Sequence, residues 1–123
     1  MLKKEVRVMR KWACLDNITE YNGYQISKVM IYETANDGVY VFLYDSPESQ
    51  ICVAEEWYVS VTEATNAWDS YIRNKHWTEI SDPLPNCQDD SILPIRVKGR
   101  DIGKPEWGVY ELFLNGSWVA YKE

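Results

Sequence analysis

The chain has 123 residues, of which 46% are hydrophobic and 26% are charged, and its formal net charge is −6. This length and composition exclude a disordered chain and fit a single domain over residues 1–123, whose core needs no disulfide bonds. The net negative charge disfavours nucleic acid as a partner, and no apolar run is long enough to span a membrane, so we expect neither partner.

The three cysteines, Cys14, Cys52 and Cys87, are an odd number without metal-ligand spacing. Any disulfide would leave one thiol over, which favours a reducing compartment. The first residues carry charges throughout and lack the uninterrupted apolar stretch of a signal peptide. We therefore predict a cytoplasmic protein.

The first half of the chain reads as β-strands. Residues 6–14 alternate apolar and polar side chains, with Arg10 on the apolar side, which predicts a half-buried strand. Two further runs, 24–33 and 39–45, are joined by a loop whose Asp-Gly pair is typical of a hairpin. The second of these runs begins VYVFLY and is apolar on both faces, so we expect elements packed against both its sides. Residues 51–59 predict the next strand.

One helix is predicted, over about 61–75. Ser60 and Glu63 form a capping box, in which the serine oxygen accepts from the Glu63 amide and the Glu63 carboxylate reaches back to the cap. An apolar stripe then follows at helical spacing, formed by Ala64, Ala67, Trp68, Tyr71 and Ile72. This stripe should place the helix across the sheet.

The remaining strands are short. Residues 77–80 and 95–98 predict two of them, and Asn115-Gly116 between 107–114 and 117–121 is the strongest local hairpin pattern in the chain. The fold class is therefore α+β. We expect a strongly twisted or partly closed antiparallel sheet of about six to eight strands, with the single amphipathic helix packed on one face.

Glu55 is the acidic residue whose predicted position is hardest to reconcile with a core. In a regular strand it would lie in the middle of the apolar face of 51–59, where a bare carboxylate is costly. Arg10 could neutralise it as a structural partner, or a β-bulge could turn it outward. The functional alternative is a small-molecule or carbohydrate pocket with an aromatic-lined groove, formed by Glu55, Trp57 and Tyr58.

Patterns for catalysis and for cofactors are weak. Glu55 as an acid or base, or Cys87 with His76 as a thiol nucleophile and its base, would suit a small enzyme, which ranks third. The glycines and cations of 98–104 lack the spacing of a phosphate-binding loop. Carboxylates lie near one another in the sequence without the alternation of a calcium loop, at Asp82, Asp89, Asp90, Asp101 and Glu106. We predict no metal site and no cofactor.

The segment 81–106 is the strongest candidate for function. It is rich in prolines and charges and long for a connection within a compact domain, which favours a recognition loop. Its carboxylates would steer a partner and its neighbouring tryptophans would anchor it. The candidate contact residues are Asp82, Asp89, Asp90, Trp77, Trp107, Arg100 and Lys104.

The distribution of charge indicates what kind of partner to expect. Residues 15–90 hold fourteen acidic side chains and three basic ones. An accessible excess of carboxylates favours rapid encounter with a positively charged surface. The sequence therefore predicts a small acidic protein-binding domain, of the inhibitor or toxin-immunity type, that neutralises a basic partner.

Overall fold

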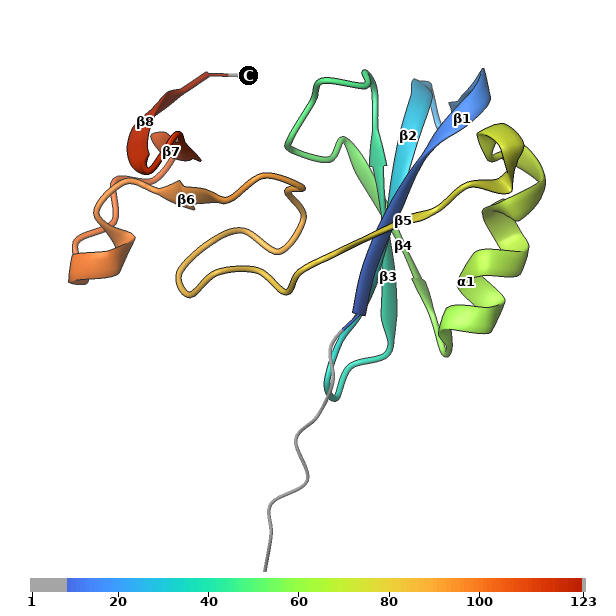
Figure 1. Cartoon of the computed structure of the whole chain (residues 1–123), viewed down its shortest axis with the longest axis horizontal. Helices are drawn as coiled ribbons and strands as arrows, with labels where there is room; N and C mark the ends of the chain where they lie inside the picture. Colours follow the sequence, from blue (N-terminus) through green and yellow to red (C-terminus); the bar gives the residue numbers. More distant parts are fainter. Residues whose placement is uncertain (1–8, 123) are drawn as a thin grey trace, which may run out of the picture.

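The computed structural model describes residues 9–122, and these form two antiparallel sheets joined by a long connection (Figure 1). The larger sheet has five strands in the order β4-β3-β2-β1-β5, and the smaller has three in the order β6-β7-β8. The α+β class is confirmed, but the single sheet of six to eight strands is wrong. Prolines between β5 and β6, at Pro83, Pro85 and Pro94, lack the N–H donor that a continuing ladder needs.

The structure fixes the bounds of each element as follows. The larger sheet contains β1 (Met9–Tyr21), β2 (Tyr24–Glu33), β3 (Val39–Tyr44), β4 (Ala54–Tyr58) and β5 (Thr78–Ile80). The smaller sheet contains β6 (Ile95–Val97), β7 (Tyr110–Leu114) and β8 (Ser117–Tyr121). The helix is α1 (Val61–Trp68), and the 3-10 turns are η1 (Asp69–Tyr71), η2 (Arg73–Lys75) and η3 (Arg100–Ile102).

Three tight hairpins organise these strands. The predicted hairpins, β2–β3 and β7–β8, are confirmed, and Asn115 and Gly116 have the left-handed φ values of 51° and 84° that such turns require. Strand β1 runs beyond its predicted end to Tyr21, because Asn22-Gly23 forms a further turn of this kind. Residues 6–8 of the predicted first strand lie outside the described residues.

The helix is shorter than its apolar stripe predicts. Regular α-helix ends at Trp68, and Ile72 is extended (φ −81°, ψ 133°) because it forms an antiparallel bridge with Leu15. Asn74 and Lys75 then take positive φ values, which no α-helix continues through. The bridge thus buries Ile72 against β1, while Tyr71 remains exposed.

The start of the helix agrees closely with the capping box. Ser60 is extended, and its Oγ accepts from the Glu63 amide at 3.2 Å. The Glu63 carboxylate accepts from the amide of Val59, one residue before the cap, at 3.3 Å. The Glu63 amide in the first turn and the Val59 amide just before the cap therefore each have a partner.

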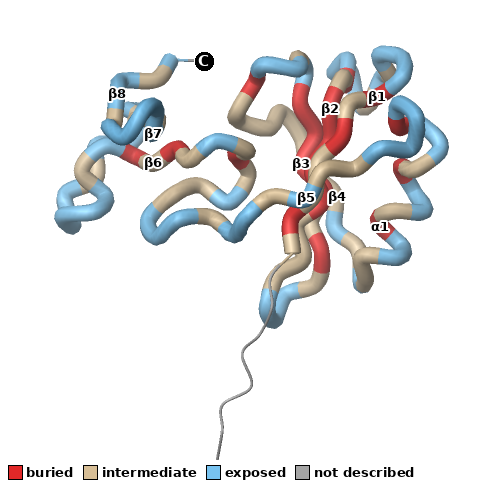
Figure 2. The backbone as a smooth tube through the Cα atoms, viewed as in Figure 1, coloured by how far each residue is buried: buried red, intermediate tan, exposed pale blue. Residues whose placement is uncertain are grey.

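Strand β3 is covered on both faces, as its apolar sequence predicts. Val39, Val41 and Leu43 join a core that α1 closes with Ala64 and Trp68. Phe42 and Tyr44 face the opposite side, where they pack with Met30 of β2. Figure 2 shows that the buried backbone is concentrated in β2 and β3. No helix within residues 9–122 has the length and apolar character needed to cross a membrane.

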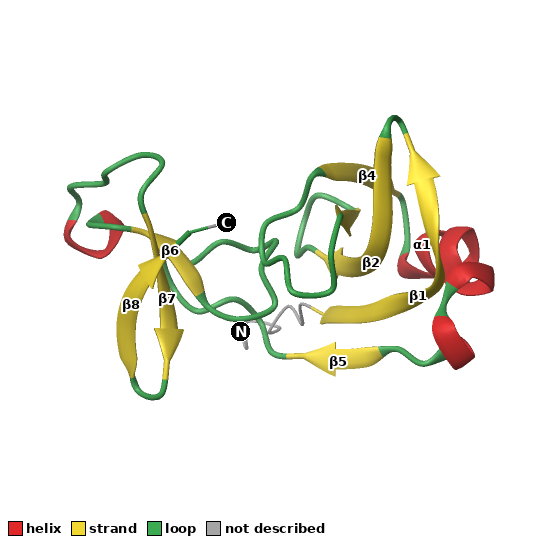
Figure 3. Ribbon diagram, turned by 90° about the horizontal axis from the view of Figure 1, so that it is seen from above, coloured by secondary structure: helices red, strands yellow, loops and turns green. Residues whose placement is uncertain are grey.

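The smaller sheet stands apart from the larger one and from α1, with the connection between them (Figure 3). Its inner residues Ile95 and Val97 are buried, whereas Phe113, Leu114 and Val119 are exposed. Arg96 ties the sheet together, because its guanidinium pairs with Glu111 of β7. The larger sheet therefore supplies most of the core, and the smaller sheet extends from it.

Candidate functional site: an acidic aromatic cleft

The proline-rich segment 81–94, here termed the covering loop, lies against the face of the larger sheet opposite α1. Arg10 of β1 holds it there, with only 4% of the residue exposed. Its guanidinium donates to the carbonyl oxygens of Ser81 (2.7 and 2.9 Å), Ser91 (2.8 Å) and Asp89 (3.2 Å). A planar guanidinium can satisfy several carbonyls at once, so one buried cation fixes both ends of the stretch 81–91 of the loop.

A second anchor lies at Asp90. The Tyr44 hydroxyl donates to the Asp90 carbonyl, and one oxygen of the Asp90 carboxylate accepts from the Cys52 amide at 3.3 Å. Burial raises the pKa of the Asp90 carboxyl, and burial together with this carboxyl raises the pKa of the Cys52 thiol to about 12. Asp90 therefore points inward and positions the loop.

Beyond the covering loop, the same face of the sheet carries a row of aromatic rings. Tyr32 lies opposite Tyr40 in the β2–β3 register, and Phe42 follows two residues later on the same face. The Tyr40 and Phe42 rings are nearly parallel, at 4°, with centroids 6.0 Å apart, and the Tyr32 and Phe42 centroids are 6.3 Å apart. Tyr32 and Tyr40 are half-buried, whereas Phe42 is only 4% exposed, so the two phenol rings form the accessible aromatic surface and Phe42 lies beneath it.

Three carboxylates border this aromatic surface. Glu55 lies opposite Phe42 on β4, Asp37 comes from the β2–β3 turn, and Asp89 comes from the covering loop. With the rings they enclose a hollow of about 350 Å³, here termed the cleft, which is lined by Tyr32, Thr34, Asp37, Tyr40, Phe42, Glu55 and Asp89. Carboxylates and aromatic rings thus converge from β2, β3, β4, the β2–β3 turn and the covering loop.

The β2–β3 turn sets the position of Asp37. The Thr34 hydroxyl accepts from the Asp37 amide at 2.8 Å and donates to the Gly38 carbonyl at 2.7 Å. The Trp57 indole donates to the Asp37 carbonyl at 2.7 Å. A Cβ added to Gly38 would lie only 2.5 Å from the nearest carbon of the Trp57 ring. Because Gly38 also has a φ of +71°, only glycine fits this position without strain.

The cleft carries negative charge that no side chain lining it neutralises. Among the residues that the structure describes, its lining contains three carboxylates and no lysine or arginine. Of the fourteen acidic residues between 15 and 90, Asp69 alone forms an ion pair within the described part of the chain, with Lys75 at 4.0 Å. The hydrogen bond to Asp37 raises the pKa of Tyr40, and burial with the charge of Asp89 raises that of Tyr32, so both phenols stay neutral.

The three acidic residues of the predicted contact set lie in different surroundings. Asp89 lines the cleft, whereas Asp90 is turned inward. Asp82 is exposed and lines a second hollow of about 760 Å³ together with Arg10, Leu84 and Phe113. The charge of Asp82 also contributes to the raised pKa of Tyr32, so it adds to the negative field at the cleft.

The two tryptophans and two cations of that set lie away from the cleft. Trp77 packs on the core beneath α1, donates to Asp69 at 3.1 Å and has the Lys11 ammonium 4.8 Å from its ring centre. Trp107 is 76% exposed in the smaller-sheet region, where Arg100 and Lys104 are also exposed. The structure therefore does not bring the predicted contact residues onto one surface.

The alternative pocket of Glu55, Trp57 and Tyr58 is divided between the two faces of β4. Glu55 is exposed and lines the cleft, while Trp57 is 52% exposed and covers the turn. Tyr58 faces the helix. The expected pair between Arg10 and Glu55 does not form, because Arg10 donates to the covering loop instead.

Glu56 is the carboxylate of β4 that faces the core, and it was not among the residues predicted from the sequence. It accepts from the Tyr58 hydroxyl at 2.8 Å and from the Trp68 indole at 2.7 Å. Burial and this hydrogen bond raise the pKa of Tyr58 to about 12. The strand becomes regular only at Ala54, so alternation counted from Ile51 assigned the wrong face to each acid.

The residues of the weaker chemical hypotheses are spread out. His76 lines a hollow with Cys14 and Arg73, whereas Cys87 forms an isolated bridge with Arg96 beside the smaller sheet. Burial raises the pKa of the Cys87 thiol, which opposes formation of a thiolate nucleophile. Within residues 9–122 no three histidine, cysteine or acidic side chains are grouped to hold a metal ion.

Three aromatic residues of the cleft, Tyr32, Tyr40 and Phe42, were not among the predicted site residues. Their two-residue spacing and the hairpin register were present in the sequence and could have placed them on one face beside Glu55. Comparisons with protein-family models, with curated proteins and with solved structures find no match for this chain.

Proposed function

We propose that this protein binds a basic partner protein through the cleft and the carboxylates around it, as an inhibitor or toxin-immunity protein does. The observation that carries the proposal is the convergence of Asp37, Glu55 and Asp89 on an aromatic surface whose lining, among residues 9–122, includes no cation. Aromatic rings supply contact area, and unneutralised carboxylates supply steering and specificity for a positive partner.

Some contacts of the covering loop anchor it to the sheet, while Asp89 faces the cleft, and this arrangement supports the proposal. Arg10, Tyr44 and Asp90 hold the loop rigidly, so the side chain of Asp89 is presented at low entropic cost. Within the segment 81–106, for which a recognition role is predicted, Asp89 is therefore the proposed contact residue. The neighbouring Asp82 strengthens the negative electrostatic field at the cleft. Trp107, Arg100 and Lys104 have no place in the cleft.

The test compares two variants that lose the same charge. The cleft variant carries Asp37→Asn, Glu55→Gln and Asp89→Asn, and the control carries Asp16→Asn, Glu20→Gln and Glu48→Gln at exposed positions outside the cleft. Each is used with the wild type to capture proteins from a host lysate. Captured proteins are then purified, and their affinities are measured by calorimetry at several salt concentrations.

We expect a purified basic partner that binds the wild type with an affinity that falls as salt rises. The cleft variant should bind about 100-fold or more weakly, at roughly 1 kcal/mol for each of the lost contacts, whereas the control should stay within about threefold. Equal affinity for the wild type and the cleft variant would reject the cleft as the binding surface. Salt-independent binding, or a partner that is not basic, would reject the electrostatic basis of the proposal.

A further inference from the structure

Elsewhere in this protein, aromatic rings beside carboxylates are covered by the chain's own cations. Lys11 lies 4.8 Å from the centre of the Trp77 ring, and Lys28 lies 4.8 Å from that of Tyr44. Arg96 lies over Trp118 at 3.9 Å. Such cation–π contacts are most favourable when the cation is shielded from water.

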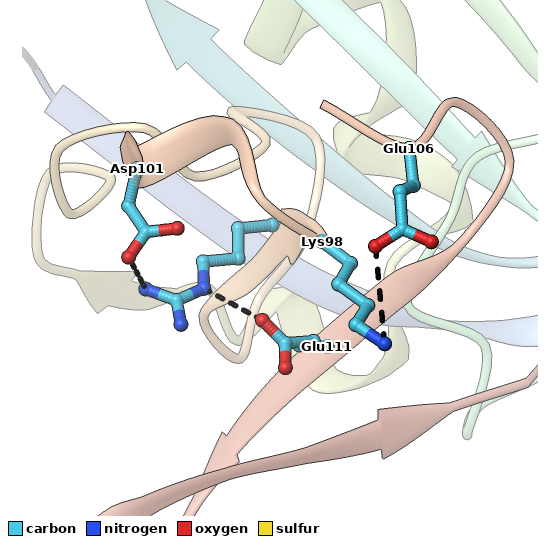
Figure 4. A network of polar contacts seen from close by, with 5 residues as sticks. Lys98, Asp101, Glu106 and Glu111 are labelled. Carbon is cyan, nitrogen blue, oxygen red and sulfur yellow. Dashed lines mark hydrogen bonds and ion pairs between the residues drawn. The ribbon is translucent and has the colours of Figure 1, made fainter. Parts of the chain in front are cut away.

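Arg96 shows how this protein surrounds a guanidinium. The Arg96 side chain stacks on Trp118. It also donates to Glu111 at 3.1 Å and lies 3.4 Å from an oxygen of Asp101, and Figure 4 draws both carboxylates around the guanidinium. One flat ring and two carboxylates therefore satisfy one arginine. Lys98 pairs separately with Glu106 at 3.8 Å and makes no such stack.

The cleft contains similar groups, and no cation lines it among residues 9–122. The charge of Arg10 acts on Asp89 and Tyr32, but its N–H donors bind the carbonyl oxygens of the covering loop. The half-buried Tyr40 ring, which packs parallel to the buried Phe42 ring, offers the flat surface, and Asp37, Glu55 and Asp89 offer the carboxylates. Among residues 9–122 no lysine or arginine lies over the Tyr32, Tyr40 or Phe42 rings. The charge and shape of the cleft are therefore complementary to a guanidinium supplied from outside the described chain.

We propose that the cleft receives one arginine side chain of the partner, with its guanidinium stacked on the Tyr40 ring and hydrogen-bonded to carboxylates that line the cleft. This inference rests on the proposed function and specifies its central contact. Arginine fits better than lysine, because its planar cation stacks on rings and its five N–H donors reach several carboxylates together. A volume of about 350 Å³ is at the small end for ligand pockets and suits one long side chain.

The test uses three capped pentapeptides with glycines around one central residue, which is arginine, lysine or citrulline. Citrulline keeps the shape of arginine without its charge. Each peptide is titrated into the ¹⁵N-labelled full chain, and amide shifts are followed by NMR. We expect the arginine peptide to shift amides of the cleft in a saturable manner, about fivefold or more tightly than the lysine peptide, and the citrulline peptide to have no effect.

Two variants distinguish stacking of the guanidinium on an aromatic ring from general electrostatic attraction to the carboxylates. Tyr40→Leu keeps an apolar strand residue but removes a ring of the cleft, while Tyr24→Leu makes the same change at an exposed position outside the cleft. The preference for arginine over lysine should fall to about twofold or less in the first and stay unchanged in the second. An unchanged preference in Tyr40→Leu would overturn the stacking geometry.

Other results would overturn the arginine assignment while leaving partner binding intact. Equal affinity for the arginine and lysine peptides, shifts outside the cleft, or no shift up to about 50 mM peptide would each do so. A further arm uses Lys3→Gln/Lys4→Gln/Arg7→Gln, because these three cations lie outside the described residues. Binding seen only in that variant would identify the chain's own residues as the occupant and would overturn the proposal.

Discussion

Arg10 shows how one buried cation can position a loop. Its guanidinium meets only carbonyl oxygens of the covering loop, and burial lowers its pKa without removing its charge in the physiological range. A hydrogen bond to a charged group contributes more than one between neutral groups, which offsets part of the cost of burying the cation. Arg10 therefore acts on the cleft through the backbone of Asp89.

We predict that Arg10→Met lowers the free energy of unfolding by about 2 kcal/mol, because the loop carbonyls lose their donors. Urea unfolding measures this change, and hydrogen exchange should show faster exchange of amides in 81–91. Arg73→Met is the matched control, since Arg73 is exposed and makes one long bond, 3.4 Å, to the Leu15 carbonyl. Equal effects of the two substitutions would contradict the anchoring role of Arg10.

At the level of elements, different interactions determine where α1 begins and where it ends. The cap at Ser60 fixes the start of the helix, while tertiary pairing of Ile72 with Leu15 fixes where regular structure ends. Capping is a local effect that the sequence reveals, whereas the bridge joins residues far apart in the chain. This difference explains why the predicted start is confirmed and the predicted end at about residue 75 is wrong.

We expect Ser60→Ala to destabilise the protein by about 1 kcal/mol, because the Glu63 amide loses its acceptor. Ser60→Asp should retain most of the stability, since a carboxylate also caps a helix and favours its positive end. Ser70→Ala, at an exposed position of η1, serves as the control and should change stability by less than about 0.5 kcal/mol. Thermal and urea unfolding give these values, and no loss in Ser60→Ala would disprove the cap.

At the scale of the molecule, negative charge is segregated between the two sheets. The ion pairs of the smaller-sheet region engage Asp101, Glu106 and Glu111, whereas the acids around the cleft have no ion-pair partner among the described residues. Like charges that share a surface repel one another and lower the stability of the folded state. Unpaired carboxylates around the cleft are consistent with a partner that supplies the missing positive charge.

This repulsion predicts that salt stabilises the free protein. Raising sodium chloride from about 0.01 to about 0.1 M shortens the Debye length from about 30 to about 10 Å, and should raise the free energy of unfolding by several tenths of a kcal/mol. The Asp16→Asn/Glu20→Gln/Glu48→Gln variant, with net charge reduced from −6 to −3, should show a smaller increase. A decrease with salt, or an equal increase in both proteins, would argue against unscreened repulsion.

The sequence by itself determined the local features: the capping box, the Asn-Gly and Asp-Gly turns, and the apolar strand β3. Each depends on residues close together in the chain, so its physics can be followed without coordinates. Tertiary structure alone decided that the sheet divides in two, that Glu55 is exposed while Glu56 faces the core, and that Arg10 binds the covering loop. These outcomes depend on contacts between segments tens of residues apart, where one irregular residue before a strand reverses the face of every side chain that follows.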